Sequence, residues 1–234
     1  MCTCFVSRQD DLLIAMNFDN NGLKFELNAK ENNSFFVEIY TERGKNISFG
    51  MNSKKTFVND MVVDSNGKGL YKRLNKTRTL TTYLVKDLLS GKIDINNLDD
   101  YLNAMEIVNA PNLCTHNLIV DKNGNVWVIE PGRGFVKNKS EESSYFLMTN
   151  FSLMDYNSGK KYSDYGYDRY KNTKIYLENK NNLSIKDAFE ILEKVKQTGE
   201  WKTDFSMVYS KNENKIYYCY NADYKNILEY KFKQ

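Results

Sequence analysis

Histidine, proline and cysteine are scarce in this chain. The shortages of histidine and cysteine limit the catalytic pairs, disulfides and metal sites that it can form. The 234 residues contain one histidine, two prolines and four cysteines. A Ser-His-Asp or Cys-His catalytic pair must therefore use His116, or the nucleophile must have a different base. The cysteines are too few and too scattered for a disulfide scaffold, and the C-x-C spacing of Cys2 and Cys4 is not that of a zinc or redox site.

An excess of one charge and long apolar runs are also absent. The chain has 33 Lys and Arg against 30 Asp and Glu, spread along its length, whereas a nucleic-acid binder needs a basic stripe. No apolar stretch approaches the roughly 18 residues of a membrane span. Arg8, Asp10 and Asp11 occupy the place where a signal peptide has its apolar region. We expect a cytoplasmic protein with no nucleic-acid or membrane partner.

What is present is a series of strand patterns that follow one another in hairpins, interrupted twice by a pair of helix patterns. The predicted strands cover residues 2–7, 11–17, 23–27, 34–41, 46–51, 56–63, 117–120, 126–130, 134–136, 145–149, 205–209, 215–220 and 227–232. The predicted helices cover residues 77–90, 97–105, 165–179 and 184–197. Strands that follow one another in hairpins favour antiparallel sheets with helices outside them. Since no linker or repeat interrupts the pattern, we expect one domain over residues 1–234.

The second residue is the first candidate for chemistry. Cys2 begins the first predicted strand, and removal of Met1 would give it a free α-amine. In short peptides the pKa of an α-amine is about 7.7–8.0 and that of a thiol is about 8.5, so one residue can supply both nucleophile and base. That arrangement would overcome the shortage of histidine. On position alone, the more common role of such a cysteine is that of a small buried apolar residue.

Motifs along the rest of the chain favour the catalytic interpretation. The opening 1–5 segment, MCTCF, and the later Asn17-Phe18-Asp19 resemble the start of N-terminal nucleophile hydrolases. More narrowly, they resemble the choloylglycine hydrolase group, linear-amide C–N hydrolases that include bile salt hydrolases and penicillin V acylases. Further matches follow in the family's order over nearly the whole chain: Phe57-Val58-Asn59, Leu118-Ile119-Val120-Asp121, Val128-Ile129-Glu130-Pro131, Met148-Thr149-Asn150 and Asp168-Arg169-Tyr170.

The resemblance implies a fold and an activity. The fold is α+β, a four-layer αββα sandwich of two antiparallel sheets between helical layers. The activity is hydrolysis of a linear C–N amide bond through a Cys2 thioester, with no metal or other cofactor. The expected partners are a small N-acyl amide substrate and further copies of the same chain.

The resemblance also assigns roles to individual residues. Cys2 is the nucleophile, Asp19 holds its amine, and Arg169 stabilises the thiolate or orients Asp19. Asn59 and Asn150 correspond to groups near the oxyanion, where an amide donor is commonly worth about 3 kcal/mol of barrier. These five residues are the predicted catalytic set.

Two further residues are weaker candidates for substrate binding. Asn17 shares a strand face with Asp19. Tyr165 belongs to a tyrosine-rich segment that either lines an acyl or aryl pocket or packs at the entry of a helix. His116 has no role in the resemblance, and a structural or surface histidine is expected there.

The chain departs from the family at two points. Met16 stands where the family has a basic residue, and the chain is shorter than typical bile salt hydrolases. Bile salts are therefore not the first expectation for substrate. Two alternatives stay open: transfer of the acyl group to an amine, and a binding protein that has lost turnover.

Overall fold

The computed structural model describes residues 1–29, 33–42 and 44–233. Within it the chain forms two compact units. The first unit comprises Met1–Gly22, Lys139–Phe151 and Lys161–Gln234, and the second comprises Leu23–Asn138 and Ser152–Lys160. Each unit contains one large antiparallel sheet, and the single domain expected from the sequence stays a prediction.

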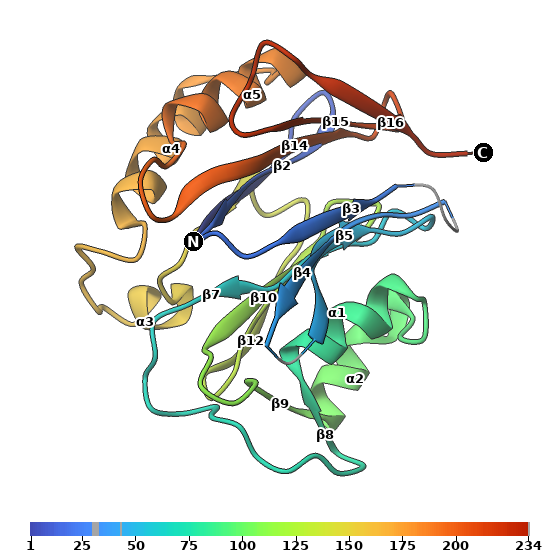
Figure 1. The fold of residues 1–234 in the computed structure, drawn as a ribbon, viewed down its shortest axis with the longest axis vertical. Helices are drawn as coiled ribbons and strands as arrows, with labels where there is room; N and C mark the ends of the chain where they lie inside the picture. The colour runs from blue at the N-terminus through green and yellow to red at the C-terminus, as the bar shows by residue number, and fades with distance from the viewer. Residues whose placement is uncertain (30–32, 43, 234) are drawn as a thin grey trace. The chain divides into compact units, whose positions relative to one another are not determined.

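The first unit is a six-stranded sheet with two helices on one face (Figure 1). Its strand order is β13-β1-β2-β14-β15-β16, and every neighbouring pair is antiparallel. The strands are β1 (Cys2–Arg8), β2 (Leu12–Asn20), β13 (Tyr145–Met148), β14 (Lys202–Ser210), β15 (Lys215–Tyr220) and β16 (Leu228–Lys231). The helices are α4 (Tyr167–Asn179) and α5 (Ile185–Lys194).

Alternating side chains attach α5 to this sheet. Phe5 and Ala15, from β1 and β2, share one buried apolar cluster with Phe189 and Leu192 of α5. The sequence predicts the start of α5 correctly, because Ser184 forms a capping box with the backbone and side chain of Asp187. The helical face of the sheet is thus the face that carries the odd-numbered residues of β1 and β2.

The second unit has an antiparallel sheet in the order β12-β11-β10-β6-β5-β4-β3, with β7 pairing to β10. Its strands are β3 (Phe25–Asn28), β4 (Phe35–Thr41), β5 (Gly44–Met51), β6 (Phe57–Asn59), β7 (Met61–Val62), β10 (Thr115–Val120), β11 (Val126–Glu130) and β12 (Gly134–Asn138). A separate parallel pair consists of β8 (Arg78–Leu80) and β9 (Glu106–Val108). The helical segments are α1 (Thr81–Leu89), η1 (Ile95–Asn97), α2 (Leu98–Ala104) and α3 (Leu153–Asn157).

An apolar cluster joins α1 and α2 to the second sheet. Leu84 and Leu88 of α1 and Leu102 of α2 share it with Ile119 and Trp127 of the sheet. The α+β class with two antiparallel sheets and flanking helices is therefore confirmed within each unit.

The strand expected over residues 56–63 is interrupted. The structure has β6 and β7 on either side of Asp60, which belongs to neither strand. The Asp60 carboxylate instead accepts a hydrogen bond from Asn117 Nδ2 at 3.2 Å. The strand is thus interrupted at a polar residue, where the apolar pattern alone predicts a continuous run.

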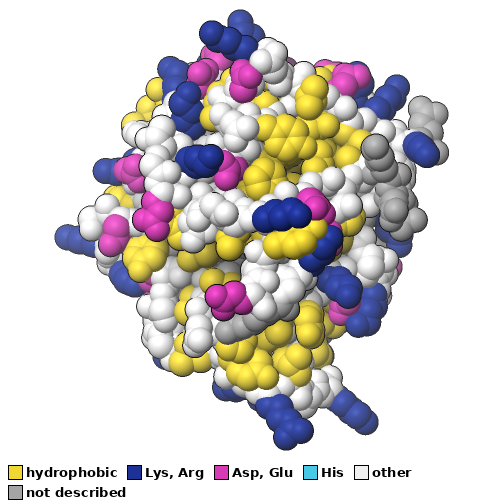
Figure 2. All heavy atoms as spheres, in the orientation of Figure 1, with side chains coloured by type: hydrophobic (Ala, Val, Ile, Leu, Met, Phe, Trp, Pro, Cys, Tyr) yellow, Lys and Arg dark blue, Asp and Glu magenta, His cyan; other side chains and the backbone are white. Residues whose placement is uncertain are grey.

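The surface agrees with the charge balance of the sequence. Basic and acidic side chains are intermixed over the face visible in Figure 2. No helix in the described part of the chain is long and apolar enough to cross a membrane.

Candidate active site

The β1–β2 hairpin fixes the position of Cys2. Cys2 lies opposite Phe18 and Thr3 lies opposite Asn17 in the antiparallel register. Directly opposed residues project on the same face of a sheet, and successive residues alternate. Thr3 and Asn17 contact helical segments, so the thiol of Cys2 projects to the opposite face, which it shares with Cys4.

Asn150 holds the backbone nitrogen of Cys2. Its side-chain oxygen accepts a hydrogen bond from Cys2 N at 2.7 Å, and both residues are buried. Asn150 follows β13, which pairs with β1. Removal of Met1 would turn this same nitrogen into the α-amine of Cys2, so Asn150 would then hold the amine.

Arg169 connects the members of the predicted set. From the first turns of α4, its guanidinium donates to Cys2 O at 2.6 Å and to Asn150 Oδ1 at 2.9 Å. It also donates to Thr3 Oγ1 at 2.7 Å and lies 3.4 Å from Asp19 Oδ2. A planar guanidinium with five N–H donors is suited to such a hub. The side chain is almost fully buried, so these partners replace water.

The start of α4 is shaped to receive this guanidinium. Gly166 has a φ of +77°, and a Cβ added there would lie 2.2 Å from Arg169 Nη2. Glycine suits this position, because its backbone adopts positive φ readily and because it has no Cβ to crowd the guanidinium. The preceding Tyr165 also has a positive φ of 52°, and its carbonyl accepts a hydrogen bond from Asn150 N at 3.1 Å.

Asp19 is a buried carboxylate surrounded by donors. Thr203 Oγ1 donates to Oδ1 at 2.5 Å, and Gln197 Nε2 donates to Oδ2 at 2.7 Å. Burial raises the pKa of Asp19 to about 6 although Arg169, Thr203 and Gln197 all favour the ionised form. The carboxylate therefore changes charge close to neutral pH.

The nucleophile candidate and the amino terminus are desolvated as well. Burial raises the pKa of the Cys2 thiol, and it lowers the pKa of the Met1 amine. Each shift favours the neutral form of its group. The Met1 amine donates to the backbone oxygen of Asp19 at 2.7 Å.

The structure brings together four of the five predicted catalytic residues in one network of the first unit: Cys2, Asp19, Asn150 and Arg169. Asn59 belongs to the second unit, at the end of β6. There its side-chain oxygen accepts from Leu118 N at 2.9 Å, and its backbone oxygen accepts from Asn117 Nδ2 at 2.9 Å. Its role near an oxyanion stays a prediction.

The two weaker candidates lie in different surroundings. Asn17 is fully buried, donates to Leu192 O of α5 at 2.8 Å and accepts from Ser206 Oγ at 2.7 Å. These bonds connect β2 to α5 and β14. Tyr165 is 41% exposed, which leaves its ring accessible. Substrate contact by Asn17 or Tyr165 stays a prediction.

The tyrosine-rich segment packs at the entry of α4 for the most part. The rings of Tyr162, Tyr167 and Tyr170 lie around Phe151, with centroids 4.8, 5.6 and 5.0 Å away. These three rings therefore pack at the entry of α4.

Four residues of the network are absent from the sequence-based set: Thr3, Gly166, Gln197 and Thr203. Thr3 adjoins Cys2 in the sequence, and Gly166 stands three residues before Arg169. Their closeness to predicted catalytic residues is a weak indication that they belong to the site. Gln197 and Thr203 are about 180 residues from Asp19 in the chain. No local pattern connects residues so far apart.

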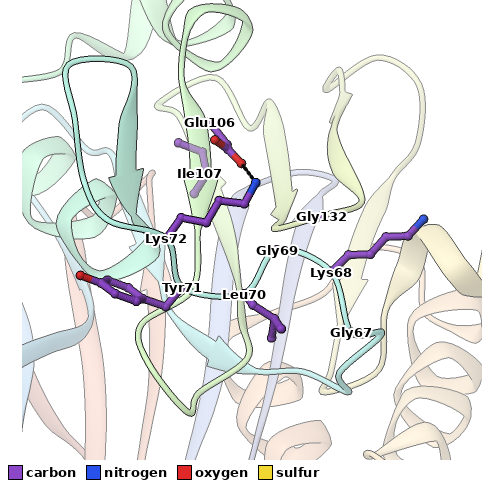
Figure 3. Close-up of a pocket in the computed structure, with 9 residues that line it drawn as sticks. All are labelled: Gly67, Lys68, Gly69, Leu70, Tyr71, Lys72, Glu106, Ile107 and Gly132. Atoms are coloured by element: carbon purple, nitrogen blue, oxygen red, sulfur yellow. Dashed lines mark hydrogen bonds and ion pairs between the residues drawn. The ribbon is translucent and has the colours of Figure 1, made fainter.

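The second unit has a pocket of its own (Figure 3). It measures about 530 Å³ and is lined by Gly67–Lys72, Glu106, Ile107 and Gly132. Lys72 is ion-paired with Glu106 at 2.5 Å, as Figure 3 shows. None of the predicted catalytic residues is among its lining, so we do not assign the reaction to it.

Comparison with known family models and with curated protein sequences found no match. Solved structures do share the fold. A mutant of the conjugated bile acid hydrolase from Clostridium perfringens matches with a TM-score of 0.65 at 15% identity, over 100% of this chain and 97% of that one. Penicillin V acylase from Agrobacterium tumefaciens matches with a TM-score of 0.65 at 12% identity, over 94% and 83%.

A third match is the Caenorhabditis elegans ortholog of N-acylethanolamine-hydrolyzing acid amidase. Its TM-score is 0.63 at 14% identity, over 90% of this chain and 93% of that one. At such low identities these likenesses establish the fold. The chain therefore has the fold of this group of hydrolases, as the sequence motifs predict.

Proposed function

We propose that the chain is a cysteine N-terminal nucleophile amidohydrolase that cleaves the linear C–N amide bond of an N-acyl compound. The observation that carries this proposal is the network around Cys2. Asn150 holds the nitrogen that would become the α-amine, and Arg169 joins Cys2, Asn150 and Asp19. The fold shared with three amide-hydrolysing proteins supports the same activity.

Removal of Met1 precedes the reaction and gives Cys2 a free α-amine. The free amine of Cys2 then takes the proton of its own thiol, and the thiolate sulfur attacks the amide carbonyl carbon. The carbonyl electron pair moves to oxygen, where Asn150 is the proposed donor. Collapse of this tetrahedral species breaks the C–N bond, and the departing amine takes the proton from the ammonium group.

A water molecule completes the cycle. The Cys2 amine takes a proton from water as its oxygen attacks the thioester carbonyl, and the thiolate leaves and is reprotonated. Asp19 and Arg169 hold the charges of the amine and the thiolate in place. Neither a metal nor an organic cofactor takes part in these steps.

The test compares two cysteines of the same strand face. Cys2→Ala should lower turnover by at least about a thousandfold, because the nucleophile is lost. Cys4→Ala is the matched control, since Cys4 is also buried in β1 on the same face. The assay uses purified protein with conjugated bile acids, N-acylethanolamines, penicillin V and simple N-acyl amides. Full turnover by the Cys2 variant would contradict the mechanism.

Intact mass measurement separates the alternatives. Loss of one methionine together with one rapid thiol adduct at Cys2 supports an activated nucleophile. A retained methionine and no preferential labelling would favour a binding protein that has lost turnover. Adding amine acceptors to the assay distinguishes hydrolysis from acyl transfer, since only transfer yields a new amide.

A further inference from the structure

We propose that Gln197 and Thr203 form a clamp that keeps Asp19 ionised and correctly placed beside the amino-terminal residue, and so act as positioning residues for the reaction. This inference rests on the proposed function and extends it to two further residues: Gln197, which lies between α5 and β14, and Thr203 in β14. Neither residue belongs to the set that the sequence motifs identify.

Hydrogen-bond donors cover both carboxylate oxygens of Asp19. Thr203 Oγ1 approaches Oδ1 at 2.5 Å, and Gln197 Nε2 approaches Oδ2 at 2.7 Å. Arg169 Nη1 adds a third donor toward Oδ2 at 3.4 Å. An ionised carboxylate only accepts hydrogen bonds, whereas a protonated one would place its hydrogen against one of these donors. The arrangement therefore fits the ionised form.

The hydroxyl group of Thr203 can only donate in its hydrogen bond with Asp19. The backbone N–H of Gln197 donates to Thr203 Oγ1 at 2.9 Å. Since a backbone N–H can only donate, the single hydroxyl proton of Thr203 is left for Asp19. Thr203 N in turn donates to Gln197 O at 3.0 Å, so the two residues close the intervening loop on each other.

A β-bulge in β14 directs Thr203 toward Asp19. Thr203 lies opposite Asp19 and Phe205 lies opposite Phe18, so Asp204 is an extra residue in β14. Such a bulge redirects side chains relative to a regular strand. Here it allows Thr203 to face Asp19 while Asp204 accepts a hydrogen bond from Asn20 at 3.1 Å.

Other charged groups also act on Asp19. Arg169 from α4 and the amino terminus at the start of β1 favour its ionised form. The Cys2 thiol of β1 and Tyr224, which follows β15, also interact electrostatically with it. The clamp adds two neutral hydrogen-bond donors to these charged and titratable groups.

The experiment measures the titration of Asp19 directly. Protein containing ¹³C-carboxyl aspartate is titrated by NMR, and the Asp19 signal is identified by its loss in Asp19→Asn. Thr203→Val and Gln197→Met remove one donor each with little change in size. Each should raise the pKa of Asp19 by about one unit, and the acid limb of the kcat/KM profile should move upward by the same amount.

Two controls separate positioning from packing. Thr203→Ser keeps the hydroxyl and should keep the wild-type titration. Thr173→Val makes the same change at another buried threonine, whose hydroxyl has no hydrogen-bond partner among the described residues. It should leave the Asp19 titration unchanged. Gln197 is only half-buried, so its variant remains informative if Thr203→Val does not fold.

Unchanged titration of Asp19 in both folded clamp variants would overturn the proposal. Failure of the proposed function has a different signature. In that case wild-type protein hydrolyses no N-acyl amide and shows no selective labelling at Cys2. The NMR titration still measures the clamp, because it requires no turnover.

Discussion

Asp19 in the first unit and Glu130 in the second are both buried carboxylates, yet their charges are controlled differently. Burial raises the pKa of Asp19 to about 6. Burial would also raise the pKa of Glu130, but hydrogen bonds from His116, Ser152 and Leu153 outweigh it and hold that pKa below its ordinary value. The donors to Glu130 include backbone N–H groups of Leu153 and Met154 at 2.9 and 3.3 Å, at the start of α3.

The difference lies in how the donors are held. Glu130 accepts from backbone N–H groups at the start of α3 as well as from the side chains of Ser152, at 2.5 Å, and His116. These bonds fit a carboxylate that stays ionised and ties α3 to the end of β11. Asp19 binds side chains, next to a nucleophile candidate. We infer that Glu130 has a structural role and that Asp19 serves the chemistry at Cys2, where its negative charge holds the amine.

Asp19→Asn should show the largest effect on activity. The amide removes the charge that holds the amine and places an N–H₂ group against donors from Thr203, Gln197 or Arg169. We expect kcat/KM to fall by about a hundredfold or more. Steady-state kinetics with a folding check by circular dichroism provide the measurement. Near-wild-type kcat/KM would remove Asp19 from the mechanism.

Glu130→Gln should lower the stability of the chain more than its activity, in contrast to Asp19→Asn. The substitution leaves the donors at the start of α3 facing an amide, and it removes the charge opposite them. The free energy of unfolding should fall by about 2–4 kcal/mol, as measured by urea denaturation. Asp19→Asn is the comparison, and the inference fails if it destabilises the chain as much as Glu130→Gln does.

Gly166→Ala tests whether the absence of a side chain at this turn is needed to position Arg169. The added Cβ would meet Arg169 Nη2 at 2.2 Å, and the positive φ adds backbone strain. Gly199→Ala is the matched control, because Gly199 also has a positive φ, of 86°, but no atom within 4 Å of an added Cβ. Both variants should lose about 1 kcal/mol from the backbone.

Only Gly166→Ala should also lower kcat/KM, by about tenfold, because Arg169 must move. Kinetics and thermal unfolding of the two variants provide the measurements. Equal losses of activity in both would show that the space above Gly166 is not needed.

The sequence predicts the regular elements well where side-chain pattern alone decides them. The strand over 126–130 and the strand over 215–220 match β11 and β15. The expected helix over 77–90 begins later, at Thr81, because residues 78–80 pair with β9. The short strands β8 and β9 and the five-residue α3 depend on tertiary contacts and have too few residues for a periodic signal.

The site was predictable to the extent that its residues belong to motifs. Cys2, Asp19, Asn150 and Arg169 meet in one network, as the resemblance implies. His116 is buried beside Glu130, with Nδ1 at 3.3 Å from Oε1, which fits the expected structural histidine. The clamp residues were not predictable, because their role depends on a strand register and a bulge rather than on any local pattern.

The pH dependence of stability is the most direct comparison of the two carboxylates. A buried acid whose pKa is about 6 binds a proton more readily in the folded chain than in the unfolded chain, where it is about 3.9. Asp19 therefore contributes a loss of stability as pH rises from about 4 to 6, of roughly 1–2 kcal/mol. Asp19→Asn should remove this contribution.

Glu130, with its lowered pKa, contributes in the opposite direction. Its stabilisation is present above its unfolded pKa and is lost as pH falls through the lower folded value. Urea titrations at several pH values, compared between wild type, Asp19→Asn and Glu130→Gln, separate the two contributions. If Asp19→Asn leaves the slope between pH 4 and 6 unchanged, Asp19 is not the titrating group, and the proposed difference between the two carboxylates is wrong.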